Sequence, residues 1–90
     1  MKTIRVFISG IVQGIFFRNF IKENAEAYGV KGYVRNLEDG RVEAVFEGYD
    51  NDVNKMIEIC KKGPPHGRIS DIEIEKMQNQ GFSEFKILRF

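Results

Sequence analysis

The sequence predicts an α+β fold, a sandwich in which two helices cover one face of a β-sheet. Two observations support this prediction. Runs of alternating apolar residues, typical of strands, are interrupted by two longer runs in which apolar residues recur every three or four positions, as in amphipathic helices. In chain order these runs are strand, helix, strand, strand, helix, strand, with a short fifth strand at the end. A chain of 90 residues buries about 60 to 65% of its unfolded surface, which supports one core, so we interpret residues 1–90 as a single domain.

The first strand and the first helix are separated by a loop that contains two glycines. The strand is predicted over residues 3–9 (TIRVFIS), where β-branched and apolar side chains alternate with others, and we expect Gly10 to end it. The helix is predicted from Phe17 to Tyr28, because apolar residues recur there at helical spacing with charged residues between them. Gly29 follows as the positive-φ residue that commonly ends a helix.

Two further strands form a predicted β-hairpin. Residues 31–36 (KGYVRN) and 41–47 (RVEAVFE) both have the composition of strands. The connection between them ends in Asp39-Gly40, a pair that favours the positive φ angles of a hairpin turn. We therefore expect these two strands to pair antiparallel.

The second helix is predicted after residues 50–52 (DND), which offer side chains for its N-cap. Apolar residues then recur at positions i, i+3, i+4 and i+7 from Val53 to Cys60, and the turn at residues 63–65 (GPP) ends the helix. Because Cys60 lies on the apolar stripe, we expect a buried, unreactive thiol. As the single cysteine of the chain it cannot form an internal disulfide, which agrees with a reducing compartment.

The last two strands are predicted over residues 68–77 (RISDIEIEKM) and 82–88 (FSEFKIL). The element order is then βαββαβ plus a short fifth strand. Two right-handed crossovers of this kind interleave into a ferredoxin-like split βαβ sandwich, with two helices on one face of an antiparallel sheet. This architecture includes enzymes, RNA-binding modules and metabolite sensors, so the fold does not select a function.

The charge balance excludes several classes of partner. Lys and Arg number 14 against 13 Asp and Glu, a net charge of +1, so we expect no broad basic surface for nucleic acid or anionic lipid. The apolar stretch near the N-terminus is too short for a secretory signal, and no apolar run approaches the roughly 18 residues needed to cross a bilayer. We therefore expect a soluble cytoplasmic monomer with no nucleic-acid and no membrane partner.

The loop from Gly10 to Phe17 connects the first strand to the first helix. Backbone N–H groups at the start of a helix have no partner within it, and glycines at positions 10 and 14 permit the positive φ angles with which such groups converge on an anion. Arg18 can turn its planar guanidinium back over the loop and bind a phosphate through two hydrogen bonds. A phosphate-binding loop is one interpretation. Glycines that only shape the connection, with Arg18 in solvent, are the other.

The same loop closely resembles the first sequence signature of the acylphosphatase family, hydrophobic-x-G-x-V-Q-G-V-x-F/M-R. Residues 8–18 (ISGIVQGIFFR) match it with one departure, Ile15 in place of the usual valine. The family's second signature, G-aromatic-small-basic/polar-N-x3-G-x-V-x5-G, is met at every position, by Gly32, Tyr33, Val34, Arg35, Asn36, Gly40, Val42 and Gly48. The resemblance extends over the turn at residues 63–65 and the C-terminal strand, and so covers essentially the whole chain.

This resemblance implies an enzyme that hydrolyses the carboxyl–phosphate mixed anhydride of a small-molecule acyl phosphate. The products are a carboxylate and inorganic phosphate, and we expect phosphate to inhibit. The implied catalytic residues are Arg18, which holds the phosphate together with the loop amides, and Asn36, which orients the attacking water. The phosphate-binding residues implied are Val12, Gln13, Gly14, Ile15, Phe16, Phe17 and Arg18.

We expect no cofactor and no metal site. A carboxylate leaving group, whose conjugate acid has a pKa of about 4, needs no general acid. Phosphoryl transfer through a loose transition state mainly requires charge stabilisation and a water molecule in line with the leaving group. An arginine and an amide can therefore suffice.

The residues alone leave other roles open for several of these side chains. Asn36 precedes a hairpin connection and is also a normal turn former. The side chain of Gln13 is as suited to bracing the loop as to binding, and His66 is expected in solvent. Four aromatic residues are interpreted as core in preference to pocket wall: Phe16, Phe17, Phe20 and Tyr33.

Two other functional classes have less support. An RNA-binding module of the same topology is disfavoured, because the chain matches only the first three positions of its RNP1 signature, at residues 31–33, before charged and amide residues replace the apolar ones. A domain that senses a phosphorylated metabolite without turnover is disfavoured by the presence of both Arg18 and Asn36. Similar domains also occur within larger carbamoyl-transfer maturation proteins, and we favour a freestanding enzyme.

Overall fold

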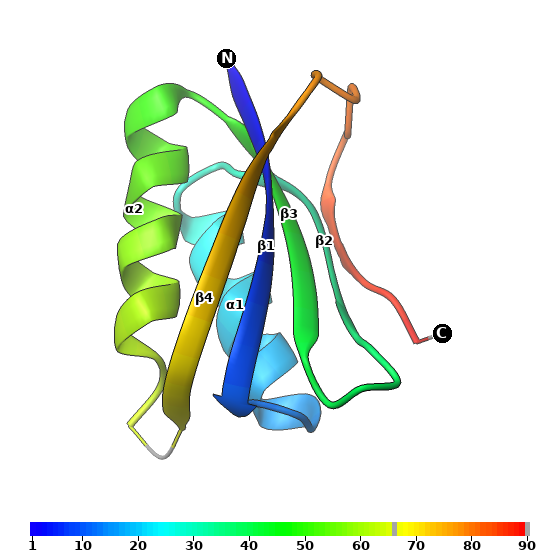
Figure 1. Cartoon of the computed structure of the whole chain (residues 1–90). Helices are drawn as coiled ribbons and strands as arrows, with labels where there is room; N and C mark the ends of the chain where they lie inside the picture. Colours follow the sequence, from blue (N-terminus) through cyan, green and yellow to red (C-terminus); the bar gives the residue numbers. More distant parts are fainter. Residues whose placement is uncertain (66, 90) are drawn as a thin grey trace.

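The computed structural model describes residues 1–65 and 67–89, so the expectation for His66 lies outside the described residues. Within these residues the chain forms five strands and two helices in the predicted order (Figure 1). Their bounds are β1 Lys2–Ile11, α1 Ile15–Ala27, β2 Lys31–Asn36, β3 Val42–Gly48, α2 Asp50–Lys62, β4 Arg68–Met77 and β5 Phe85–Ile87. None of the helices in this part of the chain has the length and apolar character that crossing a bilayer requires.

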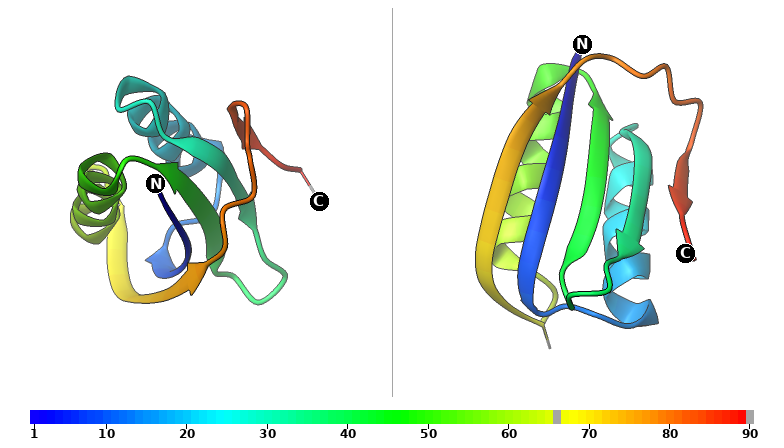
Figure 2. Two further views of the ribbon diagram at one scale, coloured as in Figure 1. Left: turned by 90° about the horizontal axis from the view of Figure 1, so that it is seen from above. Right: turned by 45° about the vertical axis from the view of Figure 1, so that its right-hand side comes forward.

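The strands form one sheet in the order β4-β1-β3-β2-β5. Neighbouring strands from β4 to β2 pair antiparallel, as predicted, but β5 pairs parallel to β2. The expectation of a wholly antiparallel sheet is therefore wrong for its last strand. The reason is the path of the chain, which crosses one end of the sheet after β4 and descends along the opposite edge (Figure 2).

Both helices pack on the same face of the sheet (Figure 2). α1 contacts β2 and β5, and α2 contacts β1, β3 and β4. The core between the layers is built from aliphatic side chains together with aromatic and sulfur-containing ones from several elements. Among these, Phe46, Phe85 and Met56 are essentially inaccessible to solvent. Cys60 is buried as predicted, and desolvation raises the pKa of its thiol to about 12.

The uncovered face of the sheet carries a buried carboxylate, Glu43, in the middle of β3. It accepts a 2.6 Å hydrogen bond from Arg35 Nε on β2, and Arg5 Nε on β1 lies 3.5 Å away. Tyr33 also donates to it, and burial together with the negative charge of Glu43 raises the pKa of that phenol. This cluster ties the three inner strands together on the face that no helix covers.

The first strand does not end at Gly10, contrary to the prediction. It continues to Ile11, because a bulge between Ser9 and Gly10 shifts the register against β4 and lets pairing resume. Gly10 has φ 132°, and a Cβ there would lie 2.0 Å from the carbonyl oxygen of Arg68. The close approach of β4 therefore requires a glycine at this position. In the sequence, a glycine inside a strand at a bulge looks the same as a glycine that ends a strand.

The start of the second helix also differs from the prediction. Tyr49 occupies the N-cap position without a side-chain cap, while Asp50 and Asp52 lie in the first helical turn. The two aspartates interact favourably with the positive end of the helix dipole, but neither accepts a capping hydrogen bond from a backbone N–H group. The predicted helix end is confirmed, since Gly63 is the C-cap with φ 73°.

Candidate active site

The loop after β1 and the end of β2 meet at one end of the sheet. β1 and β2 each pair antiparallel with β3, so they run in the same direction and both finish at that end (Figure 1). Asn36 is the last residue of β2, and the loop from Val12 to Gly14 follows β1 directly. The glycine-containing loop and Asn36 therefore lie at the same end of the sheet.

The start of α1 exposes a row of backbone donors. None of the N–H groups from Val12 to Phe17 donates a hydrogen bond to another described residue. Gly14 is the N-cap, with φ 116°, and neither a capping side chain nor an acidic residue occupies the first turn. α2 differs, because two aspartates lie in its first turn. The positive end of α1 therefore remains available to an anion.

Arg18, in the first turn of α1, turns its side chain back over this loop. Its Nε lies 3.4 Å from the carbonyl oxygen of Gly14, to which it donates a hydrogen bond. The residue is half-buried and forms no salt bridge with any described carboxylate. The guanidinium thus retains donors for a ligand.

Asn36 is held at the end of β2 by pairing with Val42 on β3. Its side-chain Oδ1 is buried and has no hydrogen-bond partner among the described residues. An unpaired buried acceptor costs about 1 to 3 kcal/mol of stability. Such a cost is typical of sites where the missing partner is a ligand or a bound water.

Arg18 and Asn36 line the same surface hollow, which has a volume of about 320 Å³. The remaining lining residues are Leu88 and Arg89, which follow β5. The two arginines carry positive charge, and none of these four residues is acidic. Sequence analysis did not identify Arg89 as a site residue, because only the parallel pairing of β5 with β2 places it beside Asn36. The one available indication was that Arg89 is a basic residue that follows the last predicted strand.

Gln13 braces the loop against the β2–β3 hairpin. Its Nε2 donates to the carbonyl oxygens of Leu37, at 2.9 Å, and Arg41, at 3.3 Å. The side chain is thereby occupied, which favours the bracing role over direct binding. Its backbone N–H remains among the free donors of the loop.

A second, apolar cavity of about 450 Å³ lies on the other side of the loop. Phe16 borders it and is 88% exposed, so its interpretation as core is wrong. The side chain points away from the sheet because Phe17, one position on, takes the core-facing position of α1. Phe17 is buried as predicted, whereas Phe20 and Tyr33 are half-buried.

The site is suited to a compact oxyanion rather than to a metal ion. No group of three or more His, Cys, Asp or Glu side chains within residues 1–65 and 67–89 is arranged to hold a metal. Convergent N–H groups, guanidinium donors and an amide acceptor are instead the groups that bind a phosphate and a water molecule beside it.

Comparisons with known proteins agree with a site for a phosphate group. A family model described as Acylphosphatase matches residues 4–87. An acylphosphatase from Rubrobacter xylanophilus is 51% identical over 89% of this chain and 73% of its own length. The crystal structure of acylphosphatase from Bacillus subtilis matches with a TM-score of 0.92 at 34% identity, over 98% of this chain and 99% of that one. The structure of T. kodakarensis HypF contains a similar region, at 38% identity and a TM-score of 0.86, covering 100% of this chain and 12% of HypF.

Proposed function

Because this chain belongs to the acylphosphatase family, we propose that Arg18 and the loop amides hold the phosphate of an acyl phosphate while Asn36 directs the attacking water. The enzyme hydrolyses the mixed anhydride to a carboxylate and inorganic phosphate. The observation that carries the assignment of residues is the unpaired Oδ1 of Asn36 beside Arg18 in one hollow.

The phosphate binds where the free N–H groups of the loop converge. Those groups and the helix dipole interact with its equatorial oxygens, and Arg18 adds charge-assisted hydrogen bonds from the side. The phosphate oxygens stay negatively charged in the transition state. The loop N–H groups are already in position to stabilise this charge, so they lower the energy of the transition state without having to move. Arg89 contributes a second positive charge at the rim of the hollow.

The water is positioned by Asn36. The amide oxygen accepts a hydrogen bond from the water, and the amide NH₂ can donate to a phosphate oxygen, which aligns the water with phosphorus. The new P–O bond forms from the water oxygen as the P–O bond to the acyl group breaks, and the electron pair leaves with the carboxylate. The water's protons pass to the phosphate oxygens and to solvent. No general acid is needed for a leaving group whose conjugate acid has a pKa of about 4.

We also propose that the enzyme acts as a monomer in the cytoplasm and that inorganic phosphate, its product, inhibits by occupying the loop. The buried thiol of the single cysteine, Cys60, suits a reducing compartment.

The test is hydrolysis of benzoyl phosphate by the purified, metal-stripped protein and by two variants. Arg18→Ala removes a donor that faces the transition state and should lower kcat by on the order of 10² to 10³. Asn36→Ala should also lower kcat strongly, because the water loses its orientation. Circular dichroism confirms that each variant is folded.

Lys31→Ala is the matched control for loss of a positive charge, since Lys31 is exposed at the other end of β2. It should retain wild-type turnover. Full activity of folded Arg18→Ala or Asn36→Ala would refute the assigned roles, whereas a folded wild type without activity would indicate a phosphate-sensing domain.

A further inference from the structure

Apolar side chains are concentrated on the outer side of the phosphate loop. Ile11 is 69% exposed and Phe16 88%, although both border the active-site loop. With Pro64 and Pro65 they line the cavity of about 450 Å³ described above. Exposed apolar side chains that gather beside a functional loop are a feature of surfaces that bind an apolar group.

The cavity and the hollow lie on opposite sides of the loop. Asn36 and Arg89, which line the hollow, belong to the side of β2 and β5, whereas Pro64 and Pro65 lie in the connection from α2 to β4. β4 and β5 are the two opposite edges of the sheet. The loop that carries the free N–H groups runs between them.

This placement matches the geometry of the reaction. In phosphoryl transfer the attacking and the leaving oxygen lie on opposite sides of phosphorus. With the water held by Asn36 on one side, the acyl group of the substrate projects to the other side of the loop. There it meets the apolar cavity.

We propose that this cavity binds the acyl group and that the preferred substrates are acyl phosphates with an aromatic or medium-length apolar acyl chain. The inference rests on the proposed function. The cavity volume lies within the range of about 300 to 1,000 Å³ that is usual for small-molecule pockets. Its proline walls are rigid, so little conformational entropy is lost when a ring or chain packs against them.

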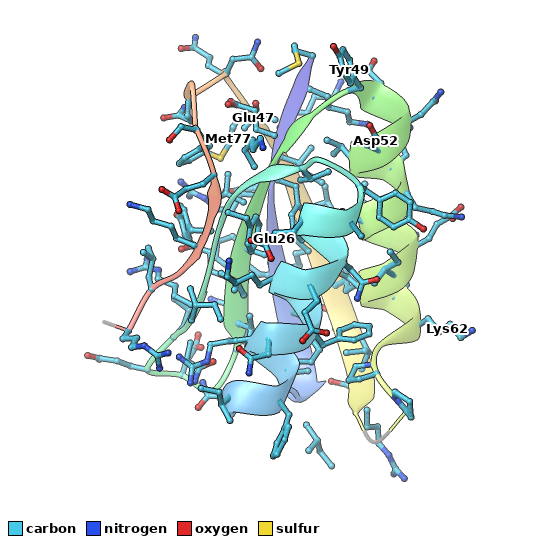
Figure 3. All side chains as sticks on the ribbon, turned by 180° about the vertical axis from the view of Figure 1, so that it is seen from behind. Glu26, Glu47, Tyr49, Asp52, Lys62 and Met77 are labelled. Atoms are coloured by element: carbon cyan, nitrogen blue, oxygen red, sulfur yellow. The ribbon has the colours of Figure 1, made fainter. Side chains whose placement is uncertain are left out.

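The experiment compares kcat/KM for acetyl, butyryl, hexanoyl and benzoyl phosphate. In the wild type kcat/KM should rise with apolar size, by up to about fourfold for each buried methylene group. The variant Ile11→Ala/Pro65→Ala removes two cavity walls outside the loop amides, and it should lower the benzoyl-to-acetyl ratio of kcat/KM by about tenfold. Tyr49→Ala is the matched control, because Tyr49 is an exposed aromatic residue at the opposite end of the molecule (Figure 3). It should keep the wild-type ratio.

The outcomes separate this inference from the proposed function. A wild type that hydrolyses all four substrates with equal kcat/KM, or a folded double variant with an unchanged ratio, overturns the inference and leaves the hydrolase intact. Sedimentation velocity tests whether the cavity is instead an interface between two copies of the chain. If the wild type is a dimer, the double variant is a monomer and the ratio of kcat/KM is unchanged, the cavity binds a second copy and the inference is wrong. A folded wild type that hydrolyses none of them overturns both.

Discussion

Asn36 has a side-chain oxygen without a hydrogen-bond partner among residues 1–65 and 67–89, while Arg18 in the same hollow makes one bond to Gly14 and retains its other donors. The two side chains therefore differ in what each offers a ligand. Arg18 offers charge to an anion, whether or not a reaction takes place. Asn36 offers an acceptor, which a water molecule can use and a deprotonated phosphate oxygen cannot.

This difference predicts a separation between binding and turnover. Arg18→Ala should weaken inhibition by inorganic phosphate by about 10- to 100-fold, the effect of losing hydrogen bonds from a charged donor. Asn36→Ala should leave the phosphate inhibition constant within about threefold of wild type while kcat falls. Steady-state inhibition and calorimetric titration with phosphate measure both quantities. Equal losses of phosphate affinity in the two variants would contradict the division of roles.

A second prediction concerns the pH dependence of the rate. Arginine stays protonated throughout the neutral range and asparagine does not titrate, so no catalytic group should change its charge there. We expect kcat measured between pH 5.5 and 8.5, a range of about three units around neutrality, to be nearly constant. A sharp bell-shaped profile in that range would reveal an acid or base outside the proposed pair.

At the scale of elements, the loop between β1 and α1 depends on two glycines that serve different purposes. Gly10 permits the bulge of β1, where a Cβ would meet the backbone of Arg68. Gly14, with φ 116°, sets the direction of the free N–H groups, and a Cβ there would meet no heavy atom within 4 Å. Gly10 is therefore needed for the pairing of β1 with β4, and Gly14 for the orientation of the loop N–H groups.

Alanine substitutions should separate these purposes. Gly14→Ala strains the backbone by about 1 to 3 kcal/mol and should lower kcat/KM by redirecting the amides, with the fold retained. Gly10→Ala should destabilise the whole fold more strongly, because the clash is with backbone. Gly29→Ala, another positive-φ position with open space but at the far end of α1, is the control for strain alone. Urea denaturation and benzoyl phosphate kinetics measure the effects, and wild-type kcat/KM in Gly14→Ala would contradict a role for this loop.

At the scale of the whole molecule, a buried carboxylate fixes the chain crossing that brings β5 to the far edge. Glu47 lies near the end of β3 (Figure 3). It accepts hydrogen bonds from the backbone N–H groups of Gln80, Gly81 and Phe82 and from the hydroxyl of Thr3. Burial alone would raise the pKa of Glu47, but these four bonds outweigh it and the pKa is lowered from its ordinary value of 4.5. The ionised form therefore stabilises the fold.

The sign of this shift predicts how stability depends on pH. A carboxyl group with a lowered pKa stabilises the folded state fully above 4.5, and the contribution is lost as the pH falls through the lower folded-state value. Glu47→Gln should reduce the free energy of unfolding at pH 7 by about 2 kcal/mol and flatten its decline in acid. Glu58→Gln, at an exposed position on α2, is the control. Urea denaturation at a series of pH values gives these energies, and parallel acid profiles for wild type and Glu47→Gln would contradict the role.

The sequence predicted most elements closely, because their signals are local. The strands at residues 31–36 and 68–77 have the predicted bounds, and both helices and the buried Cys60 were identified from apolar spacing. Arg18 and Asn36 were selected by motif, and their placement in one hollow agrees with that selection. Their catalytic roles remain predictions.

What the sequence did not reveal depends on contacts between distant residues. The sequence itself indicated which side of each element is apolar. From this pattern followed the α+β class, the order of the elements and the loop predicted to bind a ligand. Only the tertiary structure decided that β1 continues past Gly10, that β5 runs parallel to β2 and that Arg89 joins the hollow. It also decided that Phe16 faces a cavity and not the core. The physical reason is that periodicity records burial along one element, whereas edge choice, bulges and shared pockets follow from packing between segments far apart in the chain.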